Sequence, residues 1–262
     1  MADAAPTTFE TTCPSGVRGM FRRFKVGDQR LITDRRLVSE GRLFSELAKN
    51  VWVTTLDAGP YGDKLEWGRA LQSDAFHVCL QARLATLGNE TTYQITCPDD
   101  VCRRRFAHTV DLSRIPCLPA APEVIEALRH PEDGFIAELS TGRRLRVKPI
   151  LTSDMQALAQ IQHKTPQMFA TLSLTRRIIE IEGVDRHPRK IQAAVEDMDR
   201  TEGDELLDKL DEMDGGYKTT GLEVECPTCR YQWEDSLPLA SDFFLRRKDS
   251  SRSSNEVSGS TT

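Results

Sequence analysis

The stretch Cys226-Pro227-Thr228-Cys229 has a chemical counterpart far upstream, Cys97-Pro98-Asp99-Asp100-Val101-Cys102. Two cysteines in a tight loop place two sulfur atoms on one side, and two such loops supply the four thiolates that Zn²⁺ binds tetrahedrally. Each pair follows a short alternating apolar run, at 93–96 and 222–225, which is typical of a strand end. We therefore predict one structural Zn²⁺ site, similar to a zinc ribbon, with these ligands: Cys97, Cys102, Cys226 and Cys229.

The two cysteine pairs differ in spacing, which leaves alternatives open. The second pair is C-x2-C, whereas the first is the looser C-x4-C. A redox dithiol, two unrelated turns or a disulfide are the competing interpretations. His108, six residues after Cys102, is an alternative fourth ligand. Nothing in the spacing indicates the open coordination position of a catalytic zinc site.

Composition restricts the class of protein. The chain has 262 residues, 39% of them hydrophobic, with a net charge of −5, so it can bury a sizeable core in one large domain or two modest ones. No apolar run approaches the ~20 residues of a membrane helix, and the N-terminus lacks the features of a secretory signal. We expect a cytosolic, reducing environment, in which paired thiols favour metal binding. The acidic balance argues against a nucleic-acid partner.

A spacing of 126 residues recurs along the chain. The segment 9–16 resembles 135–142, each with a turn at its end, and Asp28 and Asp154 both stand between a predicted strand and a predicted helix. This pattern predicts an internal duplication. The predicted fold class is α+β, with two duplicated hairpin-plus-helices halves joined by the zinc-ribbon-like four-cysteine site.

The predicted domain organisation follows from this repeat. Each half begins with a hairpin, continues in helices and ends in a cysteine knuckle, and both termini lack enough apolar residues to pack. The predicted segments are a disordered N-terminus (1–8), a first half (9–115), a linker (116–134), a second half (135–245) and a disordered tail (246–262).

Helices are predicted from apolar periodicity and from the residues that begin and end helices. In the first half they cover 44–51 and about 67–87, the latter ended by Gly88. In the second half Ser153 and Gln156 form a capping box before one helix, and Pro166 opens another that runs through Ile178 and Ile179. Two more follow Pro188 and Gly203.

Other motifs carry little functional signal. The basic run 103–105 is typical of a solvated face, and Cys79 lies in an apolar pattern typical of a buried thiol. The acidic stretch 197–208 has its glycine and its last carboxylate in the wrong places for a calcium loop. No converging nucleophile, acid and base stands out, so we predict that the chain is not an enzyme.

Several stretches together resemble the T4-type bacteriophage baseplate protein family, over nearly the whole chain. They are Pro14-Ser15-Gly16, Thr55-Leu56-Asp57-Ala58-Gly59-Pro60-Tyr61, the helix from Leu71-Gln72-Ser73-Asp74 to Leu87-Gly88, Cys97 with Cys102-Arg103-Arg104-Arg105-Phe106, Asp111-Leu112, Thr141-Gly142-Arg143-Arg144, Val224-Glu225-Cys226-Pro227-Thr228-Cys229 and Phe243-Phe244. The chain departs from the family at Ser73, where glycine is expected. The four cysteines correspond to the family's two knuckles.

The resemblance implies a role in tail assembly without enzymatic activity. The expected function is that of a baseplate hub assembly protein or minor baseplate component that binds other tail proteins. One alternative is a tape-measure or tail assembly chaperone that is absent from the mature particle. Another, from a different class, is a zinc-dependent enzyme or nucleic-acid-binding ribbon. The expected partners are baseplate hub or tape-measure proteins, in the host cytoplasm during assembly, with the virion baseplate as a second location.

Overall fold

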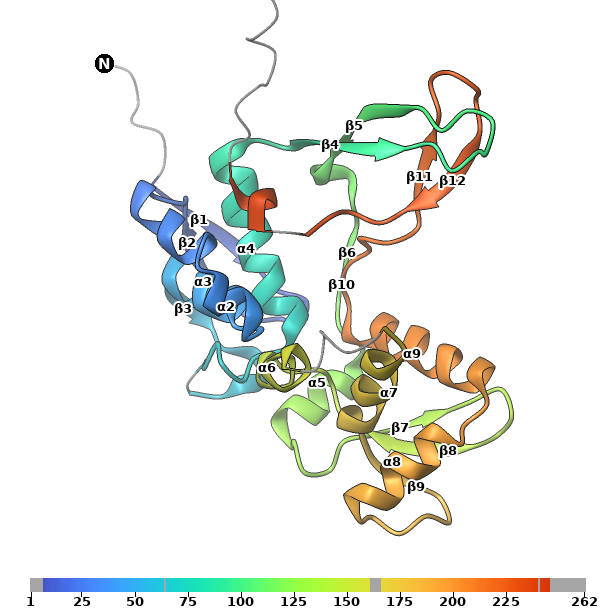
Figure 1. Cartoon of the computed structure of the whole chain (residues 1–262). Coiled ribbons are helices and arrows are strands. Elements are labelled where there is room, and N and C mark those ends of the chain that lie inside the picture. Colours follow the sequence, from blue (N-terminus) through green and yellow to red (C-terminus); the bar gives the residue numbers. More distant parts are fainter. Residues whose placement is uncertain (1–6, 64, 161–165, 240, 246–262) are drawn as a thin grey trace, which may run out of the picture.

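The computed structural model describes residues 7–63, 65–160, 166–239 and 241–245, and over these residues the chain is a mixed helix and sheet structure. Figure 1 shows two bodies, each with a small sheet and helices, and a pair of hairpins that stand clear of both. The terminal segments predicted to be disordered, 1–8 and 246–262, lie outside the described residues except for residues 7 and 8. The first strand already includes Thr8.

The first body is built on an antiparallel sheet of order β1-β2-β3. Its strands are β1 (Thr8–Thr12), β2 (Arg18–Arg22) and β3 (Trp52–Asp57). Between β2 and β3 the chain forms η1 (Val26–Asp28), α1 (Gln29–Ile32), α2 (Arg35–Ser39) and α3 (Leu43–Val51). After β3 come η2 (Gly59–Tyr61) and the long α4 (Gln72–Leu87), which packs against α3.

The second body is also built on a three-stranded antiparallel sheet, of order β7-β8-β9. Its strands are β7 (Phe135–Glu138), β8 (Arg144–Val147) and β9 (Ile178–Ile181). The helices α6 (Thr152–Ala159) and α7 (Pro166–Arg177) lie between β8 and β9 in sequence. They are preceded by α5 (Pro122–Arg129) and followed by α8 (Pro188–Glu196) and α9 (Arg200–Asp214).

The two sheets share their residue register at a spacing of 126 positions. In the first sheet β2 pairs with β3 as Gly19↔Thr55, Met20↔Thr54 and Phe21↔Trp52. In the second sheet β8 pairs with β9 as Leu145↔Ile181, Arg146↔Glu180 and Val147↔Ile178, each residue 126 positions later. The irregularity between Met20 and Phe21 also recurs between Arg146 and Val147. A shared bulge is informative because bulges are specific features of a strand rather than defects.

The same spacing of 126 positions relates two sets of polar contacts, one after the second strand of each sheet. Asp28 accepts a hydrogen bond from the backbone N–H of Lys25 (2.7 Å) and forms an ion pair with Arg22 (2.7 Å). Its counterpart Asp154 accepts from the backbone N–H of Leu151 (3.1 Å) and pairs with Lys148 (3.0 Å). Both carboxylates are buried and satisfy backbone donors at the beginning of a helical segment.

Two hairpins and a short ribbon connect the bodies. Strands β4 (Glu90–Thr96) and β5 (Arg105–Asp111) follow α4, and β11 (Leu222–Glu225) and β12 (Gln232–Asp235) follow α9. The chain passes between the bodies through β6 (Cys117–Leu118), which comes after β5, and through β10 (Gly216–Tyr217), which comes before β11. These two strands pair antiparallel. Short η3 (Leu112–Arg114) leads into β6, and η4 (Ser241–Phe244) returns to the first body, where the Phe244 ring lies 5.9 Å from that of Phe44.

Each body has its own apolar core. The first core contains buried side chains from residues 13–115 together with Leu237, Phe243 and Phe244. The second contains side chains from residues 120–210 together with Leu71. Leu71 belongs to a bridge with Leu151, and Thr152 donates to the carbonyl oxygen of Ala70 (2.9 Å), so the start of α6 attaches the second body to the first.

Three sequence predictions about elements are wrong. The helix expected from about 67 begins at Gln72, because Leu71 is extended and forms a bridge with Leu151, and the neighbouring backbone groups of Ala70 and Gln72 bond to Thr152 and Ile150. Ile178 and Ile179 leave the predicted helix and form β9. Asp154, rather than Ser153, accepts the capping hydrogen bond at the start of α6.

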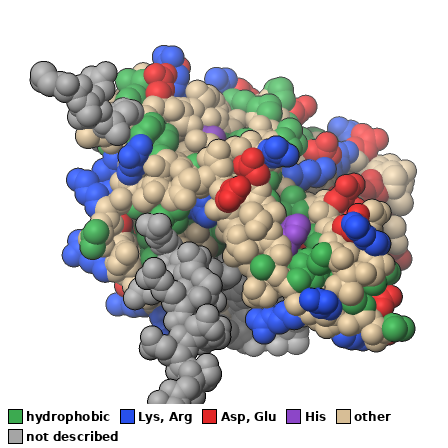
Figure 2. Space-filling model, turned by 90° about the horizontal axis from the view of Figure 1, so that it is seen from above, with side chains coloured by type: hydrophobic (Ala, Val, Ile, Leu, Met, Phe, Trp, Pro, Cys, Tyr) green, Lys and Arg blue, Asp and Glu red, His purple; other side chains and the backbone are tan. Residues whose placement is uncertain are grey.

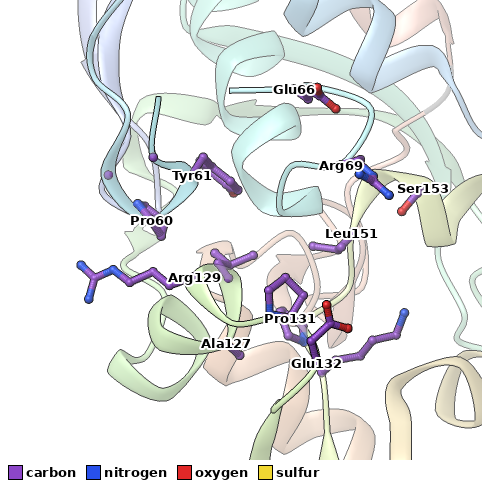
Figure 3. A pocket seen from close by; sticks show the side chains of 15 residues that line it. Pro60, Tyr61, Glu66, Arg69, Ala127, Arg129, Pro131, Glu132, Leu151 and Ser153 are labelled. Atoms are coloured by element: carbon purple, nitrogen blue, oxygen red, sulfur yellow. The ribbon is translucent and has the colours of Figure 1, made fainter. Parts of the chain in front are cut away.

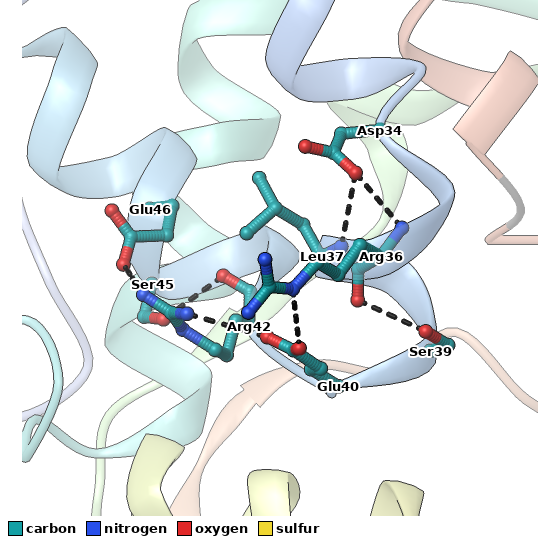
Figure 4. A network of polar contacts seen from close by, with 8 residues as sticks. All are labelled: Asp34, Arg36, Leu37, Ser39, Glu40, Arg42, Ser45 and Glu46. Atoms are coloured by element: carbon teal, nitrogen blue, oxygen red, sulfur yellow. Dashed lines mark hydrogen bonds and ion pairs between the residues drawn. The ribbon is translucent and has the colours of Figure 1, made fainter.

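The surface is charged and mixed in sign. Arg42 bridges Glu40 (3.3 Å) and Glu46 (2.6 Å), while Arg36 pairs with Glu40 (2.7 Å), at the corner between α2 and α3 (Figure 4). Such exposed pairs contribute little individually. Gly41 turns this corner at φ +66°, and a Cβ there would lie 2.3 Å from a backbone oxygen of α6.

Figure 2 shows basic and acidic side chains interspersed, with apolar ones in small groups. Among the described residues no helix is both long and apolar enough to cross a bilayer.

Candidate metal centre

The four predicted cysteines meet where the tips of the two hairpins approach each other. Their sulfur atoms all lie within 4.8 Å of one another. The Sγ atoms of Cys97 and Cys229 are 3.6 Å apart, and those of Cys102 and Cys226 are 3.8 Å apart. Within the part of the chain that the structure describes, this is the one group of three or more His, Cys, Asp or Glu side chains close enough to share a metal ion.

Both knuckles have the same backbone geometry. The N–H of Cys97 donates to the carbonyl oxygen of Arg104, and the N–H of Cys226 donates to that of Tyr231, each at 2.9 Å. The residue after the last cysteine, Arg103 or Arg230, has a positive φ of 44° or 63°. No other described non-glycine residue adopts a positive φ. Because this conformation costs a non-glycine residue about 1–3 kcal/mol, its recurrence indicates that the turn is imposed by the knuckle.

The hairpins also contact each other through their inner faces. In β4 and β5 the more buried residues alternate with exposed ones, as they do in β11 and β12. The ring of Phe106 lies edge-on to that of Trp233, with the centroids 6.2 Å apart. Aromatic contacts of this geometry contribute about 0.5–1.5 kcal/mol beyond area burial. The aromatic contact and the cysteine group thus both link the two hairpins.

The four thiols differ in how readily they lose a proton: the pKa of Cys226 is lowered, whereas the pKa values of Cys97 and Cys229 are raised by burial and by the neighbouring thiols. The backbone N–H of Cys229, together with that of Thr228, lowers the pKa of the Cys226 thiol to about 6, although burial acts in the opposite direction. Burial raises the pKa of the Cys97 thiol. Four neighbouring thiolates repel one another, so all four ionise together only when a cation compensates them.

The donor set and its dimensions fit a tetrahedral metal. Zn–S bonds of about 2.3 Å place the sulfurs of a tetrahedral site about 3.8 Å apart. The two cross-hairpin distances of 3.6 Å and 3.8 Å agree with that value. Four thiolate ligands fill the coordination sphere of Zn²⁺ and leave no position for water, which is the arrangement of a structural site.

The other candidates singled out in the sequence lie outside this group. His108 is in β5, with its ring against the edge of Tyr93 (5.6 Å), and does not join the four cysteines. Arg103 is exposed and pairs with Asp100, in agreement with a solvated face. Cys79 is fully buried, and its thiol contacts the carbonyl oxygen of Phe44 (3.4 Å), as predicted for a structural cysteine.

A second polar cluster, missed in the sequence, lies beside the β6–β10 ribbon. The ring of His77 has Nε2 2.7 Å from Thr11 Oγ1 and Nδ1 3.4 Å from the Cys117 thiol, and it stacks on Tyr217. Burial lowers the pKa of His77 to about 4 and raises the pKa of Cys117 to about 11. A reactive cysteine needs the opposite shifts, so this pair is neutral and structural. No sequence spacing could have identified it, because its members come from four separate segments.

A cleft of about 820 Å³ lies between the bodies (Figure 3). Glu66, Arg69 and Ser153 line one side of it, and Pro131 and Glu132 line the other. Its volume suits a ligand or a protein segment. Its charges are mixed in sign, and they do not converge on one point as an active site requires.

In comparisons with protein-family models, with curated proteins and with solved structures, no match to the chain was found.

Proposed function

We propose that Cys97, Cys102, Cys226 and Cys229 bind one structural Zn²⁺ ion, in a zinc-ribbon-like site formed by two hairpins. The proposal is supported by the four sulfur atoms within 4.8 Å of one another and by the matching hydrogen bonds of the two knuckles. The bound ion would supply charge compensation and a cross-link. Because the cysteine pairs are far apart in sequence, such a link removes much conformational freedom from the unfolded chain.

We further propose that the chain is an internal duplication. The equal strand orders, the shared β2–β3 and β8–β9 registers and the equivalent Asp28 and Asp154 contacts support it. In this view each half contributes one hairpin and one cysteine pair, and the metal lies near the axis that relates the halves. The halves differ most after the third strand, where the second body has the additional helix α8.

The function that we propose is non-enzymatic: the chain acts as an assembly protein that binds other proteins through its surface. The observation that carries the proposal is the closed set of four sulfur ligands, because it stabilises a scaffold and leaves no open metal position for substrate. The buried carboxylates Asp28, Asp74 and Asp154 have hydrogen-bond partners within the protein, as structural groups do. These features favour binding over chemistry.

The resemblance to the T4-type baseplate family indicates the biological process in which we propose that this binding takes place. We propose that the partners are baseplate hub or tape-measure proteins of a contractile phage tail, met in the host cytoplasm during assembly. The alternative within the same process is a tape-measure or tail assembly chaperone that leaves before the particle matures. The alternative of another class, a zinc-dependent enzyme or nucleic-acid-binding ribbon, is less favoured because the site is closed and the net charge is −5.

Two measurements test the proposal at separate levels. Metal analysis of protein purified under reducing conditions is expected to give one zinc per chain, and protein that contains none would overturn the metal assignment. Electron microscopy of lysates is expected to show tail-less heads or stalled hub intermediates when the gene is disrupted, and again when the zinc site is disrupted. As a matched control, deletion of residues 248–262 is expected to leave assembly intact. Normal contractile tails in the disrupted strain would overturn the assembly role.

A further inference from the structure

Two close sulfur contacts in the metal centre run between the hairpins. Cys97 on the first hairpin faces Cys229 on the second at 3.6 Å, and Cys102 faces Cys226 at 3.8 Å. These two contacts place one cysteine of each hairpin against one of the other, so oxidation can join the hairpins at two points.

Each of these cross-hairpin pairs combines an accessible cysteine with a buried one. Cys229 is exposed and Cys102 is partly exposed, whereas Cys97 and Cys226 have no exposed surface. In thiol oxidation an accessible thiolate reacts first, and a neighbouring cysteine then resolves the product. Both pairs supply these two roles, with one reacting sulfur and one resolving sulfur on opposite hairpins.

We propose that the four-cysteine centre is a site of oxidative modification, at which a peroxide converts it into two cross-hairpin disulfides, Cys97–Cys229 and Cys102–Cys226. This inference uses the same four thiols as the proposed zinc site, but it does not depend on which metal occupies them. The oxidised, metal-free chain thereby keeps its hairpin tips joined, whereas removal of the metal under reducing conditions releases them.

The chemistry balances with hydrogen peroxide as the oxidant. The accessible thiolate attacks one peroxide oxygen, so the O–O bond breaks, a sulfenic acid forms and the departing hydroxide takes up a proton as water. The buried thiolate then attacks the sulfenic sulfur, the S–O bond breaks and a second hydroxide leaves and is protonated. Each disulfide thus consumes one peroxide and two protons and yields two waters. The metal ion leaves with its charge unchanged.

Trypsin separates the two hairpins into distinct peptides, which makes the test direct. Cys97 and Cys102 lie on the peptide 84–103, and Cys226 and Cys229 lie on 219–230. The metal-loaded full-length protein is treated with two equivalents of hydrogen peroxide, alkylated and digested without reduction. The expected product is one species in which these peptides are joined, with the mass of both less four hydrogen atoms, formed in parallel with metal release. Cys117, on the separate peptide 115–129, serves as the internal control, because its thiol lies beside His77 outside the four-cysteine group and is expected to be alkylated and unlinked.

Several outcomes would overturn the proposal. They are separate peptides that have each lost two hydrogens, cysteines carried to sulfinic or sulfonic acid, and thiols that survive intact. Pair assignment is tested by double variants: Cys97→Ser with Cys229→Ser should link the peptides about tenfold faster than Cys97→Ser with Cys226→Ser. Equal rates would contradict the assignment. If the variants fail to fold, fragmentation of the linked wild-type peptides at Pro98 and Pro227 identifies the same pairs.

The zinc content measured before oxidation separates this inference from the proposed function. Protein that contains no zinc but forms the cross-hairpin disulfides would overturn the zinc proposal and leave this inference standing. Zinc-loaded protein that oxidises within each knuckle would do the reverse.

Discussion

The guanidinium of Arg177 lies 2.7 Å from the carboxylate of Asp214, and both side chains are almost fully buried. These residues end α7 and α9, so the pair joins two helices of the second body. Burial raises the pKa of Asp214 to about 7, against the opposing effect of Arg177. Burial therefore favours the protonated form of Asp214 in the folded protein, so the free energy of unfolding depends on pH.

We expect Asp214 to lower stability as the pH rises. Its folded pKa lies above the unfolded value, so its stabilising contribution is present at low pH and is lost between about 4 and 7. At 1.36 kcal/mol per unit, the free energy of unfolding of the wild type should fall by about 3 kcal/mol relative to Asp214→Asn between pH 5 and pH 8. Urea unfolding of both proteins at the two pH values measures this difference. A wild type and variant that respond equally to pH would contradict the expectation.

His77 should have the opposite effect on stability. Burial depresses its pKa to about 4, so the neutral ring stabilises the fold above the unfolded value of about 6.5, and that contribution is lost as the pH falls toward 4. Because this window overlaps that of Asp214, the two effects partly cancel in the wild type. Relative to His77→Gln, the wild type should lose about 3 kcal/mol between pH 7 and pH 4.5. The exposed His130 provides the matched control at neutral pH, because His130→Gln removes a histidine at the surface and should change the free energy of unfolding by less than about 0.5 kcal/mol.

Asp28 and Asp154 should be interchangeable in their contribution to stability if the halves are duplicates. Each carboxylate is buried, accepts a hydrogen bond from a backbone N–H and forms an ion pair with a basic side chain. Asp28→Ala and Asp154→Ala should each cost about 1–3 kcal/mol, because both leave a buried donor unpaired. Glu40 is only partly buried, at the surface corner between α2 and α3, and Glu40→Ala should cost less than about 1 kcal/mol. A large cost at one position and none at the other would show that the equivalence is limited to shape.

Loss of one metal ligand should destabilise the whole chain. The apparent binding free energy of a structural four-ligand zinc site is on the order of 10 kcal/mol, and much of it supports folding. Cys229→Ser should therefore abolish zinc binding and lower the urea midpoint, and a chelator should do the same to the wild type. His108→Ala should retain both zinc and midpoint, since that ring lies against Tyr93 outside the cysteine group. Loss of zinc in the His108 variant would restore histidine as a candidate ligand.

The meeting of the cysteines could be predicted from sequence because their chemistry and spacing are both explicit. The strands that precede the knuckles, and the helices α3 and α8, were likewise indicated by alternation, periodicity and proline positions. These signals are local, so they survive without knowledge of tertiary contacts.

The strands β3 and β9 could not be predicted in the same way. Each begins at the residue after a helix ends, at Trp52 and Ile178, with no glycine or proline between. Pairing with the neighbouring strand, rather than a local signal, converts the chain from helix to strand there. Arg103 and Arg230 are a similar case, because the sequence gives no glycine at the two positions that adopt a positive φ.

Because β6 pairs with β10, the chain passes between the bodies as two hydrogen-bonded strands rather than as a single linker. A protease that cuts either strand therefore produces two fragments that remain associated, held by the other strand, the hairpin tips and the contact of η4 with the first body. Gel filtration of nicked protein would show one particle, while a denaturing gel would show two bands. Limited proteolysis analysed only on denaturing gels would therefore indicate two separable domains, although the folded protein stays together as one particle.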